Sequence, residues 1–137
     1  ASDVYKRQPL MARLKSDLID LLCAACTGTL DQVDVQWDDR TACCVVMAAR
    51  GYPDAPKKGA VIEGLDDAEK YDGVRITIAG ATRTKDGTTA VSGGRVLGVT
   101  GLGTTIAEAR DKAYAACDKI KFEGAQYRRD IGAKPSR

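Results

Sequence analysis

Histidine is absent from all 137 residues of the chain, and this absence limits the chemistry it can perform. Histidine is the commonest general base in enzymes, so Ser–His and Cys–His nucleophile pairs are excluded. A single Cys23-x-x-Cys26 pair does not complete a zinc site without further ligands. We therefore expect neither a catalytic residue of this kind nor a bound metal ion.

Long apolar runs and a strong net charge are also missing. There is no run of about 18 apolar residues, and no charged start followed by an apolar segment and a cleavage site. The net charge is +2, from 21 basic and 19 acidic side chains, which is too balanced to indicate nucleic-acid binding. We expect a cytoplasmic protein that binds neither membranes nor nucleic acid.

Cysteines are present in an odd number and lie in apolar segments. A disulfide framework is therefore not expected, and reduced, buried thiols are. The five are Cys23, Cys26, Cys43, Cys44 and Cys117. The length suits one domain, or one domain with a fragment of another, and is small for a complete enzyme.

Two segments have the periodicity of amphipathic helices. From Pro9 to about Gly28, leucine and alanine recur at steps of three and four residues, which predicts one helix. A second helix is predicted from a capping box at Thr105–Glu108 to about Lys121. Its predicted apolar face consists of Ile106, Ala109, Ala113, Ala116, Cys117 and Ile120.

The residues between these helices favour β-strands. Residues 33–49 predict a hairpin whose second strand, from residue 41, is apolar enough to be central in a sheet. A short strand "AVIEGL" precedes an acidic turn or helix at residues 66–70. The strands "VRITIAG" and "TAVSGG" flank the strong hairpin signal Asp86-Gly87, and "RVLGVTGLG" predicts one more strand.

The stretch "SGGRVLGVTGLG" at residues 92–103 contains five glycines but fails the spacing of known phosphate loops. Spacing alone favours a bulged strand. Gly93-Gly94 before Arg95 leaves two interpretations open. Adjacent glycines with a forked cationic donor suit an anion, whereas the alternative is a hairpin edge with a surface arginine.

The tail motif "YRRD" at residues 127–130 also has two interpretations. Its arginines could hold a ligand anion. The structural alternative, which we favour, is that Arg128 or Arg129 pairs with Asp130 or Asp118 and locks the tail onto the body.

Several phrases, read in order, resemble the C-terminal part of one enzyme family. They are "LMARLKSDLIDLL", "GYPDAPKKGAVIEGLDDAE", "SGGRVLGVTGLGTTIAEARDKAYAACDKI" and "FEGAQYRRDIG", within about Gln8 to Gly132. The family is that of the phosphoribosylamine–glycine ligases, also called glycinamide ribonucleotide synthetases. The resemblance is unbroken over this range and rests on several independent phrases.

The resemblance implies a cytoplasmic enzyme of purine biosynthesis with an ATP-grasp architecture. Such enzymes use ATP and Mg²⁺ or Mn²⁺ to activate glycine as an acyl phosphate. The amine of 5-phosphoribosylamine then attacks, which gives glycinamide ribonucleotide, ADP and phosphate. The residues that hold nucleotide and metal precede the matching segment, so we expect no cofactor on this fragment and no activity from it alone.

The resemblance also implies an α+β fold. Residues 1–7 would be foreign or unstructured, and residues 8–29 would be the closing helix of the ATP-grasp module. Residues 30–132 would form a β-rich C-terminal domain of the rudimentary single-hybrid, barrel-sandwich-like type, flanked by an N-terminal and a C-terminal helix, and residues 133–137 a flexible tail. Without its parent module, the first helix should expose an apolar face.

In such an enzyme, five residues are candidates for facing phosphoribosylamine or glycine, and none is assigned a catalytic role. They are Lys15, Ser92, Gly93, Gly94 and Arg95. Relatives commonly read "FHAGT" and "IHFEG" where this chain has Ile78 and Lys121 in place of histidine. If either histidine takes part in catalysis in relatives, activity here is affected; if both are packing positions, nothing follows.

Two other function classes remain open at this point. The chain is alternatively a free-standing binding or interaction module that kept the fold of this domain. A third reading is a biotinyl- or lipoyl-type carrier domain, for which Lys85 in the "TKDG" turn is the only suitable lysine.

Overall fold

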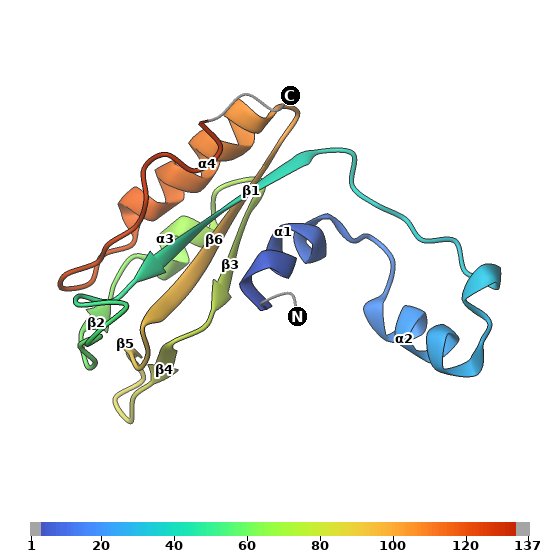
Figure 1. The fold of residues 1–137 in the computed structure, drawn as a ribbon. Helices are drawn as coiled ribbons and strands as arrows, with labels where there is room; N and C mark the ends of the chain where they lie inside the picture. Colours follow the sequence, from blue (N-terminus) through green and yellow to red (C-terminus); the bar gives the residue numbers. More distant parts are fainter. Residues whose placement is uncertain (1–3, 134–137) are drawn as a thin grey trace.

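Two small antiparallel sheets and a long C-terminal helix form the body of the protein, and two further helices lie at its N-terminal side (Figure 1). The structure is a computed structural model that describes residues 4–133. The elements are α1 (Val4–Arg13), α2 (Leu18–Thr27), η1 (Leu30–Gln32), β1 (Thr41–Ala48), β2 (Val61–Ile62), α3 (Leu65–Glu69), β3 (Val74–Ile78), β4 (Ala81–Arg83), β5 (Thr89–Val91), β6 (Arg95–Gly103) and α4 (Ile106–Lys119). The expected α+β class is confirmed, although the sheets of the described residues do not close into a barrel. No helix in this range is long and apolar enough to cross a membrane.

The larger sheet has the strand order β1-β6-β3, with both pairings antiparallel. The predicted hairpin over residues 33–49 is therefore wrong, because β1 pairs with β6. The segment before β1 turns instead toward the N-terminal helices, where Trp37 bridges to Leu14. The central strand is β6 rather than β1. The apolar sequence of β1 has another cause, because α4 and, to a smaller extent, α1 contact this strand.

The smaller sheet has the order β2-β5-β4. The β4–β5 turn lies at the predicted Asp86-Gly87, with Gly87 at φ 81°, a left-handed conformation that favours glycine. The predicted first strand of this hairpin, "VRITIAG", is wrong, because β5 pairs with Ala81–Arg83 instead. The short strand β2 and the acidic helix α3 also confirm their predictions. β3 belongs to the larger sheet, so Ala79 and Gly80 connect one sheet to the other.

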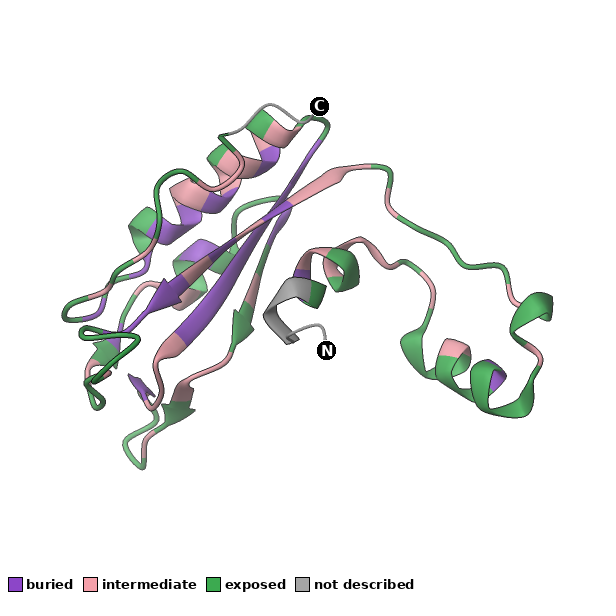
Figure 2. Ribbon diagram, viewed as in Figure 1, coloured by how far each residue is buried: buried purple, intermediate pink, exposed green. Residues whose placement is uncertain are grey.

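α4 lies along the larger sheet and buries its small side chains against it (Figure 2). Two glycines of β6 allow this close approach. A Cβ on Gly101 would lie 2.2 Å from the carbonyl oxygen of Ala109, and one on Gly103 would lie 2.6 Å from the Ala109 nitrogen. Thr105 caps the helix by accepting a hydrogen bond from the N–H of Glu108 at 3.2 Å, as predicted.

The N-terminal segment contains two helices where one was predicted. α2 begins after Asp17, which has an extended backbone and accepts a hydrogen bond from the N–H of Ile19 at 2.7 Å. An N-cap of this kind begins a new helix and interrupts the preceding one, which explains the error. Residues 4–7, expected to be foreign or unstructured, lie within α1, whereas residues 1–3 fall outside the described range.

Residues 13–38 form a helical arm that is closed at its base. The N–H of Asp38 donates to the carbonyl oxygen of Arg13 at 2.7 Å, and the N–H of Lys15 donates to that of Gln36 at 3.0 Å. Between these bonds, α2 and η1 project from the body (Figures 1 and 2). The expected apolar face is exposed there, with Ile19 at 70%.

The thiols divide between the arm and the body. Cys43 and Cys117 are buried and Cys44 is half-buried in the body. Cys23 and Cys26 are exposed on α2, a helix that buries only Ala24. This corrects the expectation that all five thiols are buried. All five cysteines are free.

Candidate functional site

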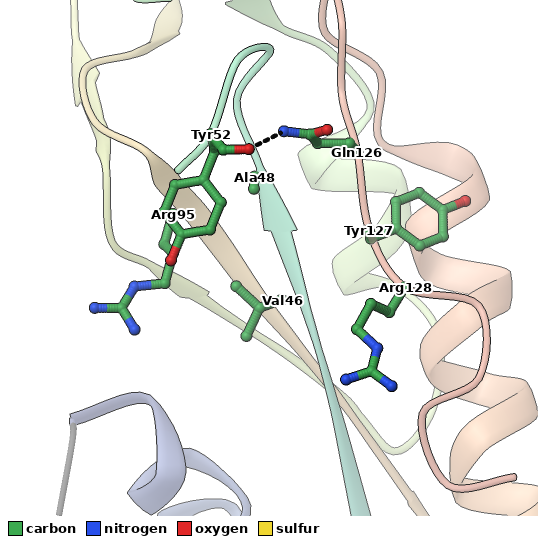
Figure 3. A pocket seen from close by; sticks show the side chains of 7 residues that line it. All are labelled: Val46, Ala48, Tyr52, Arg95, Gln126, Tyr127 and Arg128. Carbon is green, nitrogen blue, oxygen red and sulfur yellow. Dashed lines mark hydrogen bonds between the residues drawn. The ribbon is translucent and has the colours of Figure 1, made fainter. Parts of the chain in front are cut away.

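A pocket of about 440 Å³ lies where β1 ends, β6 begins and the C-terminal segment passes them (Figure 3). Four parts of the chain line it, namely β1, the β1–β2 loop, β6 and the segment after α4. The lining residues are Val46, Ala48, Tyr52, Arg95, Gln126, Tyr127 and Arg128. The volume lies in the range of small-molecule sites.

The floor of the pocket is apolar because β1 alternates its side chains between two faces. Val45 and Met47 point into the core and are 0% exposed. Val46 and Ala48 therefore point to the opposite face, where they line the pocket. The pocket thus sits on a strand whose reverse side is anchored in the most buried part of the molecule.

Arginines flank this floor from both sides. Figure 3 shows Val46 between Arg95 and Tyr52 on one side and Arg128 on the other. Arg95 is the first residue of β6 and lies opposite Ala48 in the β1–β6 ladder. The pocket lining includes two arginines and no carboxylate, which is a suitable environment for an anionic ligand.

Arg128 is held in place by its neighbours in the tail. Its Nε donates to the Asp130 carboxylate at 2.9 Å, and Nη2 donates to the other carboxylate oxygen. Its carbonyl oxygen accepts a hydrogen bond from the hydroxyl of Tyr114 on α4 at 2.7 Å. The pairing of Arg128 with Asp130 in the "YRRD" motif is confirmed, but it lies within the tail and does not itself lock the tail onto the body. The link to the body is the hydrogen bond from Tyr114.

Tyr127 connects the same segment to α4. Its hydroxyl donates to the Asp118 carboxylate at 2.8 Å. Burial, together with this hydrogen bond to a carboxylate, raises the pKa of Tyr127 to about 12, so the phenol remains a donor at neutral pH. The guanidinium of Arg129 lies 5.1 Å from the centre of the Tyr127 ring, which adds a cation–π contact.

Of the predicted turn, only Arg95 lines the pocket. The N–H groups of Ser92 and Gly93 both donate to the carbonyl oxygen of Gly80, at 2.8 and 3.0 Å. The carbonyl oxygen of Gly94 accepts a hydrogen bond from Ala49 at 2.8 Å. The turn therefore pairs with neighbouring backbone, and its contribution to the pocket is to place Arg95.

Lys15 lies apart from these residues. It is exposed at the base of the arm, beside the segment that leads into the start of β1, whereas Arg95 pairs with the residue that ends β1. The positions at which relatives carry histidine also lie outside the pocket lining. Ile78 is 50% exposed at the end of β3, and the backbone of Lys121 forms an antiparallel β-bridge with that of Glu63.

Metal-ligating side chains do not cluster in the part of the chain that the structure describes. No group of three or more His, Cys, Asp or Glu side chains in residues 4–133 is arranged to hold an ion. The described residues therefore do not fit a Mg²⁺ site.

Tyr52 and Gln126 are pocket residues that sequence reasoning missed. They are 74 residues apart in sequence, and neither belongs to a motif with a chemical signature. The only local signal was Gly93-Gly94, because paired glycines indicate a close approach by another part of the chain. The sequence did not reveal which part that is.

Comparison with known proteins gives consistent results. The family described as "Phosphoribosylglycinamide synthetase, C domain" matches residues 42–134. The phosphoribosylamine–glycine ligase of Neisseria meningitidis serogroup A is 50% identical over 93% of this chain and 30% of its own length. That of Ralstonia nicotianae is 51% identical over 95% of this chain and 30% of its own length.

A solved structure agrees with these matches. The crystal structure of the phosphoribosylamine–glycine ligase of Thermotoga maritima is 40% identical, with a TM-score of 0.62, over 80% of this chain and 27% of that one. The present chain thus spans about 30% of the length of the curated relatives named above.

Proposed function

Because this chain belongs to the phosphoribosylglycinamide synthetase C-domain family, we propose that it is the C-terminal part of an ATP-dependent ligase. That enzyme joins glycine to 5-phosphoribosylamine and forms glycinamide ribonucleotide in purine biosynthesis. The observation that carries the proposal is about 50% identity to ligases of this name over more than nine-tenths of the chain. The activity belongs to the complete cytoplasmic enzyme, and the fragment alone is inactive.

ATP and the metal ion are held by the part of the enzyme that this chain does not contain. When bound, they supply the energy that activates the glycine carboxylate. The apolar face of α2, with Ile19 and Leu22 exposed, packs against that same part of the enzyme.

The pocket receives the sugar phosphate rather than glycine. Its volume of about 440 Å³ is far larger than a two-carbon amino acid requires, and an apolar floor suits the ring of a pentose. Guanidinium groups match phosphate oxygens in geometry as well as in charge. Arg95 therefore binds the phosphate of phosphoribosylamine together with Nη1 of Arg128, since Nε and Nη2 of Arg128 are bonded to Asp130.

The remaining candidates have other positions in this proposal. Ser92, Gly93 and Gly94 shape the turn that presents Arg95 to the substrate. Lys15 lies at the base of the arm and has no role in this pocket. A contact between Lys15 and a substrate is a separate prediction.

The test is Arg95→Ala in the full-length ligase that carries this C-terminal sequence. We expect kcat/KM for phosphoribosylamine to fall more than tenfold, a loss of over ~1.4 kcal/mol in transition-state binding, with little change in KM for ATP. Arg83→Ala is the matched control, because Arg83 is exposed on β4 outside this pocket. Unchanged kinetics for Arg95→Ala would remove the pocket from the substrate site.

A further inference from the structure

The β1–β2 loop, residues 49–60, places the ring of Tyr52 next to the backbone of Gly94, the residue before Arg95. A Cβ on Gly94 would lie 2.6 Å from Cδ2 of Tyr52 and 3.5 Å from Cγ of Pro56. The φ of Gly94 is not in the left-handed region, so space rather than backbone conformation requires glycine here. The ring of Tyr52 is therefore in direct contact with the residue that precedes Arg95.

The side chain of Gln126, in the segment after α4, also holds this loop. The Nε2 amide of Gln126 donates to the carbonyl oxygen of Ala49 at 2.8 Å. It also donates to that of Tyr52 at 3.2 Å (Figure 3). The backbone of Gln126 also exchanges two hydrogen bonds with Ala48, at 2.8 and 3.0 Å. Gln126 thus joins the C-terminal segment, the end of β1 and the loop at a single point.

The loop has its own hydrogen bonds as well, so it does not depend on Gln126 to remain folded. The N–H of Ala55 donates to the carbonyl oxygen of Gly51, and that of Lys57 donates to that of Arg50, both at 2.8 Å. Without the Gln126 amide, the carbonyl oxygen of buried Ala49 still accepts a hydrogen bond from the N–H of Tyr52 at 3.1 Å. Tyr52 lines the open pocket, where water can replace the donor that its carbonyl oxygen loses. Gln126 therefore fixes where the loop sits rather than whether it forms.

From this arrangement we infer that Tyr52 determines specificity for the sugar and that Gln126 is its positioning residue. The ring of Tyr52 forms the wall against which the apolar face of the pentose packs while Arg95 and Arg128 hold the phosphate. Gln126 sets the distance between that wall and the two arginines. This inference rests on the proposed function of the pocket.

The experiment uses the full-length ligase with three substitutions, Gln126→Met, Tyr52→Ala and Tyr52→Phe. Gln126→Met keeps the length of the side chain and adds no charge, but it removes the donor to the two carbonyl oxygens, so KM for phosphoribosylamine should rise at least fivefold. Tyr52→Ala should raise it at least tenfold, and Tyr52→Phe should keep it within twofold because the ring is retained. KM for ATP and for glycine should stay within twofold in all three, with the melting temperature unchanged.

Gln32→Met is the matched control, because Gln32 is exposed in η1 on the arm. If Arg95→Ala raises KM for phosphoribosylamine while Tyr52→Ala and Gln126→Met do not, the inference fails and the proposed function stands. If none of the three has an effect, the proposed function of the pocket fails too. A uniform rise in all three KM values with a lower melting temperature would show that Tyr52 and Gln126 are only structural, and would also overturn the inference.

Discussion

Helices α2 and α4 show that apolar composition and burial are separate properties. α2 has the sequence LIDLLCAACT and buries only Ala24. α4 has many charged residues, yet four of its side chains are buried, those of Ala109, Ala113, Ala116 and Cys117. The more apolar of the two helices is thus the less buried.

The difference lies in the partner that each helix has within the chain. The small side chains of α4 fit against β6 because Gly101 and Gly103 leave room for its backbone. The large side chains of α2, such as Leu22 at 57% exposure, meet no comparable surface in the described residues. An apolar helix face therefore indicates that a partner is needed, while the shape of a facing strand decides whether the chain itself provides it.

The largest expected difference between α2 and α4 is in the reaction rates of their cysteine thiols. Burial raises the pKa of Cys117 to about 12 from an ordinary 9.0, so its thiolate fraction should be about a thousandfold lower than that of an unperturbed thiol. Cys23 and Cys26 are exposed and should react quickly. Alkylation rates measured by peptide mass spectrometry of the folded chain would check this.

Two comparisons complete the thiol experiment. In denaturant, Cys117 should react as fast as the cysteines of α2, and fast labelling of the folded chain at Cys117 would contradict the packing of α4. In the full-length ligase, Cys23 and Cys26 should become protected, whereas undiminished labelling there would show that α2 has no partner in the enzyme.

Stability should respond to substitution in the body much more than in the arm. Gly101→Ala would place a methyl group 2.2 Å from Ala109 and 2.7 Å from Ala113, which should cost about 2–3 kcal/mol of unfolding free energy. Ile19→Ala removes a larger group from a side chain that is 70% exposed, and should cost less than about 0.5 kcal/mol. Urea denaturation of both variants would measure the difference, and equal losses would contradict it.

The smallest expected effect is the pH dependence at the start of α4. Hydrogen bonds from Thr104, followed by Lys112, lower the pKa of Glu108 from 4.5 to about 2. A lowered folded-state pKa means that the stabilisation is complete above pH 4.5 and is lost as the pH falls toward 2. Glu108→Gln should flatten the melting temperature across that interval, unlike Glu123→Gln at an 81% exposed carboxylate. An unaltered profile in Glu108→Gln would refute the assignment.

The elements that could be predicted from sequence are those with a local cause. The face of α4 follows from its periodicity and its cap at Thr105, and the β4–β5 turn follows from Asp86-Gly87. The break at Asp17 was missed, because an N-cap inside an apolar repeat is indistinguishable from one polar residue on a helix surface. The strand after residue 40 was paired with its neighbour in sequence, although its partner is β6, which begins at residue 95.

The pocket was predictable only in part. Arg95 beside two glycines was a visible signal for one wall. Tyr52 and Gln126 were not visible, because they reach the pocket through a loop and a tail that are brought together by β1 and α4.

The sequence by itself determined the family, the α+β class, and the need of the first helical segment for a partner, because each depends on residue order or local periodicity. Only the tertiary structure decided that α2 stands apart from the body and that Arg95 and Arg128 flank one pocket. It also decided that the glycines before Arg95 make room for Tyr52. Those results depend on which backbones approach closely, and close approach is a property of the folded chain as a whole.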